Sequence, residues 1–220
     1  MVFHSKDHAK TRQILHLVDL SVVPISAEKG ADLAEDQIVR YVMQQCEARG
    51  IPPEHFYFDS GMRTSLVQAF SRLWSPWVGS VDCGGKPTET AVSSEIKTMC
   101  RDYYSKFITE LWFSVRLTVE SSQFRGMTEE AAKEFGEREW KMVSGNRIEV
   151  ETKEDMKIKT GHSPDLADAV AIGVYGARQR GFTITRAVSP EVVERSNLGW
   201  KREVRQRAEK LHRSGSLTYN

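Results

Sequence analysis

The segment GHSPDLADAV, residues 161–170, is the most informative part of the chain. Ser163 is a preferred helix N-cap, Pro164 suits the first helical position, and an apolar run follows, so the segment predicts the start of a helix. Asp165 and Asp168 lie three residues apart and project from one face of its first turn. Carboxylates there are costly to desolvate unless a cation or solvent compensates them. The pair is therefore a candidate site for Mg²⁺ or Mn²⁺; the alternative is that both acids only suit the helix dipole.

A second candidate acid, Asp59, follows a short apolar and aromatic run. Residues 55–58 predict a buried strand that ends at Asp59, and Gly61 lets the chain turn sharply after it. Proteins of the α/β class bind ligands at the carboxyl ends of their strands. Because Asp59 lies about 105 residues before the helix acids, the two sets can meet only through the fold. The alternative is that Asp59 caps the next helix.

Helical and extended patterns alternate along the chain, which is typical of the α/β class. The expected strands cover residues 13–23, 55–58, 77–81 and 147–151, and the expected helices cover 31–49, 64–74, 94–119 and 128–140. Trp112, in the long helix at 94–119, is expected to pack in the core rather than to stack on a base. The basic residues of that helix fit either a DNA backbone or a solvated face.

Three motifs occur in the order seen in large terminase subunits of tailed phages: FDSG at 58–61, VDCGGKPT at 81–88 and GHSPDLADAV at 161–170. Over residues 12–183 the chain resembles their C-terminal nuclease domain, whose RNase H-like fold is shared with Holliday-junction resolvases. The resemblance implies an RNase H-like mixed sheet flanked by helices. It divides the chain into an RNase H-like nuclease domain at 1–183 and a basic C-terminal extension at 184–220.

The resemblance also implies a site. The family's acids bind two metal ions and cut DNA, which makes Asp59, Asp165 and Asp168 the implied catalytic and metal-binding residues, with Mg²⁺ or Mn²⁺ as the two ions. A basic stretch directly before the acidic motif lies close enough to contact the scissile phosphate or its neighbours. The candidate DNA-binding residues are Lys153, Lys157, Lys159 and His162.

One part of the family pattern is missing. The strand at 13–23 resembles the family's third strand and residues 1–3 resemble the end of the second, so the first strand, which carries a further catalytic Asp, has no counterpart. Asp19 could substitute for that acid, although the strand count opposes this. The chain alone is therefore expected to be a poor nuclease.

The composition of the chain gives little independent support for a DNA-cutting function. The chain has 220 residues, 40% of them hydrophobic, and a net charge of only +1, which does not by itself indicate DNA binding. Its three cysteines lack the paired spacing of a zinc site, no P-loop motif for an ATPase occurs, and no apolar stretch is long enough to span a membrane. The end of the chain is basic, which fits DNA or a solvated helix, through Arg178, Arg180, Arg186, Arg195, Lys201, Arg202, Arg205, Arg207, Lys210 and Arg213.

The function implied by the resemblance is a terminase nuclease that cuts concatemeric double-stranded DNA during genome packaging. Its implied partners are DNA, the small terminase subunit and the portal protein, in the cytoplasm of the host and without a membrane. Two alternatives remain: a non-catalytic remnant that binds DNA or the portal, and another RNase H-like nuclease such as a junction resolvase.

Overall fold

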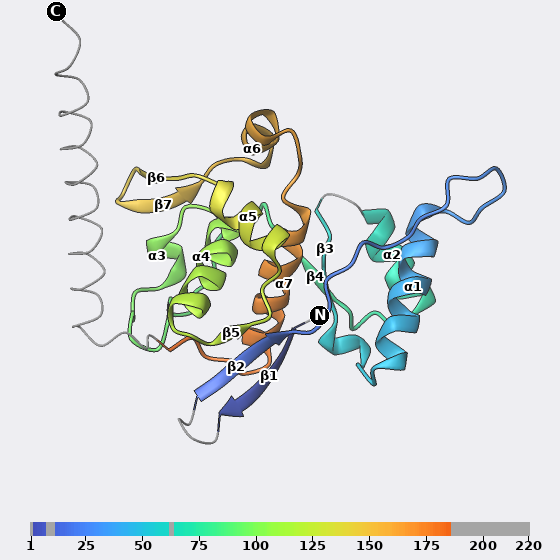
Figure 1. Ribbon diagram of the computed structural model, residues 1–220, viewed down its shortest axis with the longest axis horizontal. Coiled ribbons are helices and arrows are strands. Elements are labelled where there is room, and N and C mark those ends of the chain that lie inside the picture. Colours follow the sequence, from blue (N-terminus) through green and yellow to red (C-terminus); the bar gives the residue numbers. More distant parts are fainter. Residues whose placement is uncertain (1, 8–11, 62–63, 186–220) are drawn as a thin grey trace, which may run out of the picture. The chain divides into compact units, whose positions relative to one another are not determined.

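The computed structural model describes residues 2–7, 12–61 and 64–185. The basic C-terminal extension expected at 184–220 lies almost entirely outside these residues, so its prediction stays open. The described residues combine helices with parallel and antiparallel strands, which confirms the α/β class (Figure 1).

Within the described ranges, the strands form three small sheets rather than one. The first is mixed, because β1 runs antiparallel to β2 and β2 runs parallel to β5. The second is a parallel pair, β3 and β4, and the third is an antiparallel hairpin, β6 and β7. The bounds are Val2–Asp7 for β1, Arg12–Leu17 for β2, Tyr57–Asp59 for β3, Gly79–Val81 for β4, Phe124–Arg125 for β5, Trp140–Val143 for β6 and Arg147–Val150 for β7.

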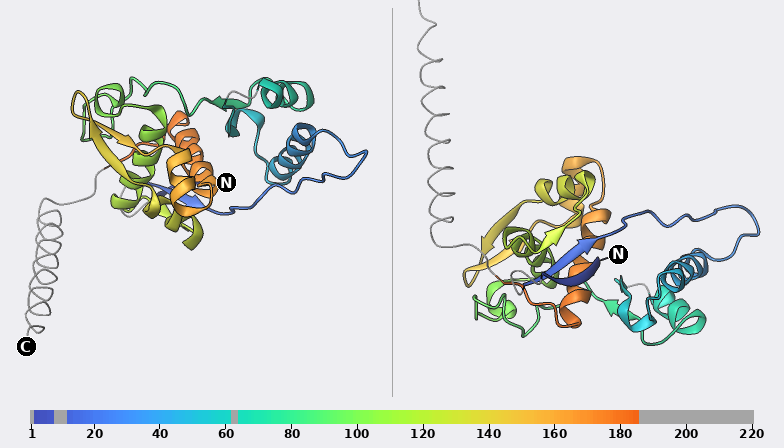
Figure 2. Two further views of the ribbon diagram at one scale, coloured as in Figure 1. Left: turned by 90° about the horizontal axis from the view of Figure 1, so that it is seen from above. Right: turned by 60° about the horizontal axis from the view of Figure 1, so that its bottom comes forward.

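Helices α4, α5 and α7 lie among the three sheets (Figure 1). Helix α1 packs against α2 (Figure 2), while α7 contacts α4, α5 and strands of both the first and the second sheet. The bounds are Ala34–Ala48 for α1, Thr64–Leu73 for α2, Cys100–Tyr103 for α3, Phe107–Glu120 for α4, Glu129–Glu137 for α5, Lys153–Thr160 for α6 and Asp165–Gln179 for α7, with a short 3₁₀ turn η1 at Pro53–His55.

The main core forms where α7 packs against α4. Val170 and Val174 of α7, and Leu111 of α4, are at most 1% exposed. Burial of each such side chain contributes about 1.5–3 kcal/mol, so this contact fixes α7 firmly in the fold. A smaller core, around Phe58 and Phe70, joins β3 to α1 and α2.

Tyr57 holds β3 against α7. A Cβ added to Gly176 of α7 would lie 2.6 Å from Cδ2 of Tyr57, and one added to Gly79 of β4 would lie 2.3 Å from its Cδ1. The ring therefore fits only because glycine stands on both sides of it. This packing places the end of β3, and with it Asp59, alongside α7.

The prediction of one long helix at 94–119 is wrong. The hydroxyl of Ser93 accepts the backbone N–H groups of Glu95 and Ile96, which closes a turn in place of the expected helix start. The chain then forms the short α3, becomes extended at Tyr104 and Ser105, where it pairs with Ile148, and starts α4 only at Phe107. The apolar spacing correctly indicated a helix over Phe107–Glu120, but the pairing with Ile148 prevents the helix from extending to residue 94.

The strand expected at 13–23 is also shorter than predicted. It ends at Leu17, and residues 18–33 have no helix or strand. Asp19 therefore lies beyond the strand rather than within it, and its carboxylate pairs with Arg49 at 3.1 Å. Strands β5 and β6, and helix α6 in the basic stretch before residue 161, were not anticipated.

Candidate functional site

The first turn of α7 carries the two predicted helix acids. The helix begins at Asp165, and Pro164 takes the cap position without a side-chain cap bond. The prediction that Ser163 caps the helix and Pro164 opens it is therefore wrong by one residue. The Ser163 hydroxyl instead lies 2.9 Å from Oδ1 of Asp165. The cap comes from α5, where the buried Glu134 accepts the N–H of Ala167 at 2.7 Å.

Asp165 and Asp168 meet at one positive charge. The ammonium of Lys153, in the first turn of α6, donates to Oδ1 of Asp165 at 2.8 Å and to Oδ2 of Asp168 at 3.0 Å. Burial lowers the pKa of Lys153, but the two carboxylates outweigh it and leave that pKa raised. Burial likewise raises the pKa of Asp165, but bonds from Lys153 and Ser163 outweigh it and leave that pKa lowered. Both shifts favour the ion pair.

The second oxygen of Asp168 is held by the protein. Trp112 donates its indole N–H to Oδ1 at 3.0 Å, and Nη1 of Arg138 lies 3.6 Å from the same oxygen. The Arg138 guanidinium stacks over the Trp112 ring at 4.4 Å, its side chain is 3% exposed, and burial lowers its pKa. Asp168 therefore presents only Oδ2 to the cation beside it. Trp112 is buried, as predicted, but its contact with the acid was not foreseen.

Asp59 stands at the carboxyl end of β3, as predicted. Its Oδ1 accepts the N–H of Gly61 at 2.9 Å, a bond that forms the expected sharp turn. Cys83, just after β4, links it to the helix acids. Burial, the charges of Asp59 and Asp168, and a hydrogen bond with Asp59 together raise the pKa of the Cys83 thiol to about 12. The charges of Asp59 and Asp168 therefore both act on this thiol.

All three predicted acids line one cavity of about 670 Å³. Lys153 lines it too, and most of the remaining wall is apolar, from α1, α2, β3 and α7. In the part of the chain that the structure describes, no three His, Cys, Asp or Glu side chains are grouped closely enough to hold a metal ion. The structure thus brings Asp165 and Asp168 to one cation and places Asp59 on the same cavity wall.

The residue types fit a divalent metal at the pair. Two carboxylate oxygens already converge on a positive charge, the ammonium of Lys153, and such oxygens are the ligands that Mg²⁺ and Mn²⁺ prefer. A cation taking that place would use one oxygen from each acid.

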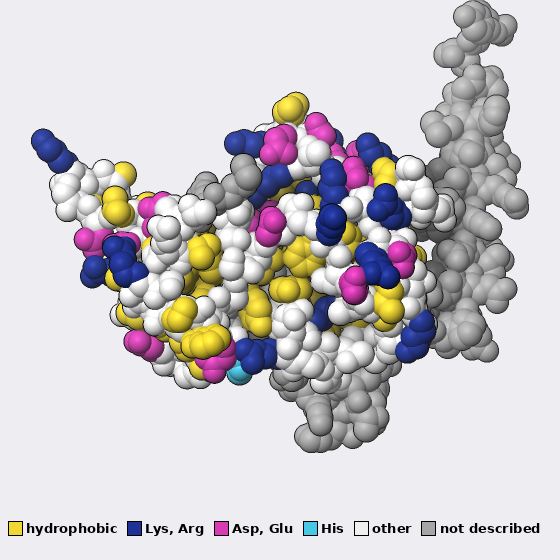
Figure 3. Space-filling view, turned by 180° about the vertical axis from the view of Figure 1, so that it is seen from behind, with side chains coloured by type: hydrophobic (Ala, Val, Ile, Leu, Met, Phe, Trp, Pro, Cys, Tyr) yellow, Lys and Arg dark blue, Asp and Glu magenta, His cyan; other side chains and the backbone are white. Residues whose placement is uncertain are grey.

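The remaining basic candidates lie on α6 and directly after it. Lys159 donates to the backbone oxygen of Glu137 at 3.0 Å and to Glu151 at 2.8 Å, while Nε2 of His162 lies 3.2 Å from Oε2 of Glu137. Lys157 is exposed on α6. Basic and acidic side chains are interspersed on the face in Figure 3. Lys153 and Lys159 therefore neutralise acids of the fold, and their contact with DNA stays a prediction.

Comparisons with known proteins give fold likeness alone. No protein-family model and no curated protein matches the sequence. Among solved structures, the nuclease domain of the large terminase subunit of bacterial virus Sf6 is similar at a TM-score of 0.47 and 19% identity, over 63% of this chain and 71% of that one. A mutant of that domain with manganese and beta-thujaplicinol has a TM-score of 0.47 and 17% identity, over 67% of this chain and 75% of that one. A mutant structure of the same terminase subunit with calcium has a TM-score of 0.47 and 16% identity, over 67% of this chain and 75% of that one. None of the described helices is long and apolar enough to cross a membrane.

Proposed function

We propose that this chain is a divalent-metal-dependent endodeoxyribonuclease domain of the large-terminase type, with Asp59, Asp165 and Asp168 as its metal ligands. One observation carries the proposal: Asp165 and Asp168 hold the Lys153 ammonium between them. The two carboxylates are already arranged around a single positive charge, the Lys153 ammonium. A metal ion that prefers oxygen ligands therefore fits in place of that ammonium.

Bound Mg²⁺ or Mn²⁺, as two ions, would supply Lewis-acid activation of water and of the scissile phosphate. The chain's own residues prepare that chemistry. Trp112 and Arg138 fix Oδ1 of Asp168, so its Oδ2 keeps a constant direction. Glu134 fixes the turn that carries both acids. Lys153, once displaced from the pair, leaves an ammonium beside the site that can contact the DNA backbone.

The finer parts of the proposal rest on the motif order at 58–61, 81–88 and 161–170. They are that the substrate is concatemeric double-stranded DNA, that the partners are the small terminase subunit and the portal protein, and that the site of action is the host cytoplasm. A junction resolvase with the same acids would prefer a four-way junction to linear duplex. Comparing cleavage of these two substrates therefore distinguishes a resolvase from a terminase nuclease.

A second candidate function is a non-catalytic DNA- or portal-binding module. It is favoured by the ion pair itself, because Lys153 neutralises the acids without a metal. Lys153→Met separates the two functions. If the pair binds a metal, removing the competing ammonium strengthens Mn²⁺ binding; if the pair is only structural, the variant loses stability and gains no affinity.

The proposal is tested by Mn²⁺-supported nicking of supercoiled plasmid with Asp168→Asn. Asp155→Asn is the matched control, because Asp155 is an exposed acid in the first turn of α6. We expect Asp168→Asn to lower the rate at least about 100-fold, since even losses outside the ligand shell cost roughly 10–100-fold, and Asp155→Asn to leave it unchanged. Nicking by Asp168→Asn at the wild-type rate would refute the assignment.

A further inference from the structure

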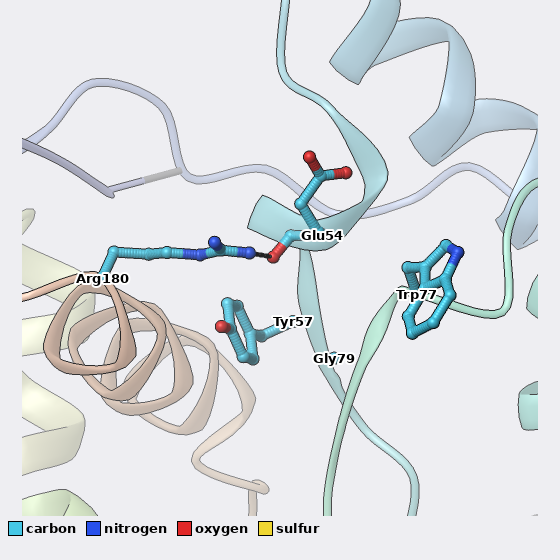
Figure 4. Close-up of a pocket in the computed structure, with 5 residues that line it drawn as sticks. All are labelled: Glu54, Tyr57, Trp77, Gly79 and Arg180. Atoms are coloured by element: carbon cyan, nitrogen blue, oxygen red, sulfur yellow. Dashed lines mark hydrogen bonds between the residues drawn. The ribbon is translucent and has the colours of Figure 1, made fainter.

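A second pocket lies where β3 and β4 meet the end of α7. It has a volume of about 510 Å³ and is lined by Glu54, Tyr57, Trp77, Gly79 and Arg180. Figure 4 shows the rings of Tyr57 and Trp77 on opposite sides of Gly79, with the Arg180 guanidinium above the Tyr57 ring and next to the backbone oxygen of Glu54. Two aromatic side chains and a cation therefore border one open space.

Glycine makes room for the Tyr57 ring at the wall of this pocket. A Cβ at Gly79 would lie 2.3 Å from the Tyr57 ring, so no other residue fits there without a shift. Because the far edge of the Tyr57 ring is confined by Gly176, this wall of the pocket cannot simply move aside. The position of the Tyr57 ring in this pocket is thus a built feature of the fold.

Trp77 is not explained by packing. Its side chain is 78% exposed, although burial of an aromatic residue of this size is a large source of stability. Exposed aromatic side chains are the surfaces on which unpaired bases stack. Trp77 is therefore available for a planar ligand.

Arg180 supplies the complementary charge. It is exposed just after the last residue of α7, and it donates to the backbone carbonyl of Glu54. A guanidinium has five N–H donors, which leaves further donors for a phosphate. The Glu54 carboxylate points away from both rings in Figure 4, so it does not fill the space between them.

We propose that this pocket binds an unpaired nucleotide of DNA, whose base stacks on Trp77 and whose phosphate pairs with Arg180. The proposal rests on the proposed function, because it takes DNA to be the ligand. Helix α7 has 15 residues and spans about 22 Å, with the acid pair at its start and this pocket at its end. That length corresponds to roughly six stacked nucleotides.

The test is the fluorescence anisotropy of a labelled oligothymidine, about a dozen nucleotides long, titrated in EDTA so that no cleavage occurs. We expect Trp77→Ala to weaken binding about 5- to 160-fold, in line with stacking of about 1–3 kcal/mol per base. Trp140→Ala is the control, because Trp140 is half exposed on β6 and lies outside the pocket. Arg180→Gln should weaken binding and reduce its salt dependence. Melting curves establish that each variant is folded.

The pocket is rejected if wild type does not bind the oligonucleotide, if Trp77→Ala binds as tightly as wild type, or if Trp140→Ala loses as much affinity. The nuclease assignment fails separately, when Asp168→Asn binds Mn²⁺ as tightly as wild type. Oligonucleotide binding that depends on Trp77, together with Mn²⁺ affinity that does not depend on Asp168, would therefore support the pocket and refute only the nuclease.

Discussion

Helices α6 and α7 both begin with two acids in their first turn, yet the two turns are built differently. In α6 the cap is local, because Thr152 accepts the N–H of Asp155 at 3.1 Å. In α7 the cap comes from another helix, through Glu134. The acids of α6 are exposed, whereas Asp168 is only 14% exposed and bonds to Trp112 and Lys153. The same local pattern thus acquires different chemistry from its tertiary neighbours.

This difference sets the magnitude of the effects expected from each turn. Exposed acids at a helix start gain about 0.3–1 kcal/mol from the dipole. A largely buried carboxylate bonded to an indole N–H and an ammonium loses far more when one partner is removed, because a buried charge is left without compensation. Substitutions in α7 should therefore affect the protein strongly where matched ones in α6 do not.

The largest effect is expected at Cys83, which lies beside the acids of β3 and α7. A pKa of about 12, against an ordinary value of 9.0, leaves about 1,000-fold less thiolate near neutral pH, so the thiol should alkylate that much more slowly than in the unfolded chain. Iodoacetamide labelling with mass spectrometry of the Cys83 peptide measures the rate. Asp168→Asn should raise it several-fold and Asp155→Asn should not. A folded-state rate within tenfold of the unfolded one would show that Cys83 does not face these acids.

The next effect concerns the two caps. Glu134→Ala leaves the buried N–H of Ala167 unpaired and should lower the free energy of unfolding by about 1–3 kcal/mol, whereas Thr152→Ala should cost about 1 kcal/mol. Glu134→Gln keeps an acceptor oxygen and should cost less than Glu134→Ala. Urea denaturation measures all three. A larger loss for Thr152→Ala than for Glu134→Ala would reverse the comparison.

The smallest effect is the pH dependence of the Asp165–Lys153 pair. Because the pKa of Asp165 is lowered, its contribution is present above about pH 4 and is lost as pH falls through the folded value. Because the pKa of Lys153 is raised, its contribution is lost only above about pH 10.4. Asp165 is 73% exposed, so wild type and Asp165→Asn should differ by less than about 1 kcal/mol near pH 6. The two stabilities should converge once the pH has fallen below the lowered pKa of Asp165. A difference that persists there in thermal melts would exclude the ion pair as its cause.

Much of the fold follows from local pattern. The expected strand ends at Asp59 as predicted, and the expected helix starts at Asp165, one residue after its predicted start, since both signals are local. The single helix at 94–119 failed because the Ser93 turn and the pairing of Tyr104 with Ile148 compete with it, and the second of these depends on residues far along the chain.

In the site, too, local spacing was predictable and contacts between distant elements were not. The spacing of Asp165 and Asp168 predicted that both lie on one face, and their shared contact with Lys153 agrees with this. Trp112, Arg138 and Glu134 could not be assigned to the site, because they reach it from α4 and from α5 with its C-cap, through the packing of these helices against α7. A buried indole N–H needs a partner, and that was the one available signal at Trp112.

The most direct test of a cation site at the start of α7 is the Mn²⁺ affinity of three proteins: wild type, Asp168→Asn and Asp155→Asn. Electron paramagnetic resonance measures this affinity. If the start of α7 is a cation site and the start of α6 is only a helix start, Asp168→Asn should weaken Mn²⁺ binding at least about tenfold and Asp155→Asn should leave it unchanged. Equal affinities in all three proteins would contradict the account.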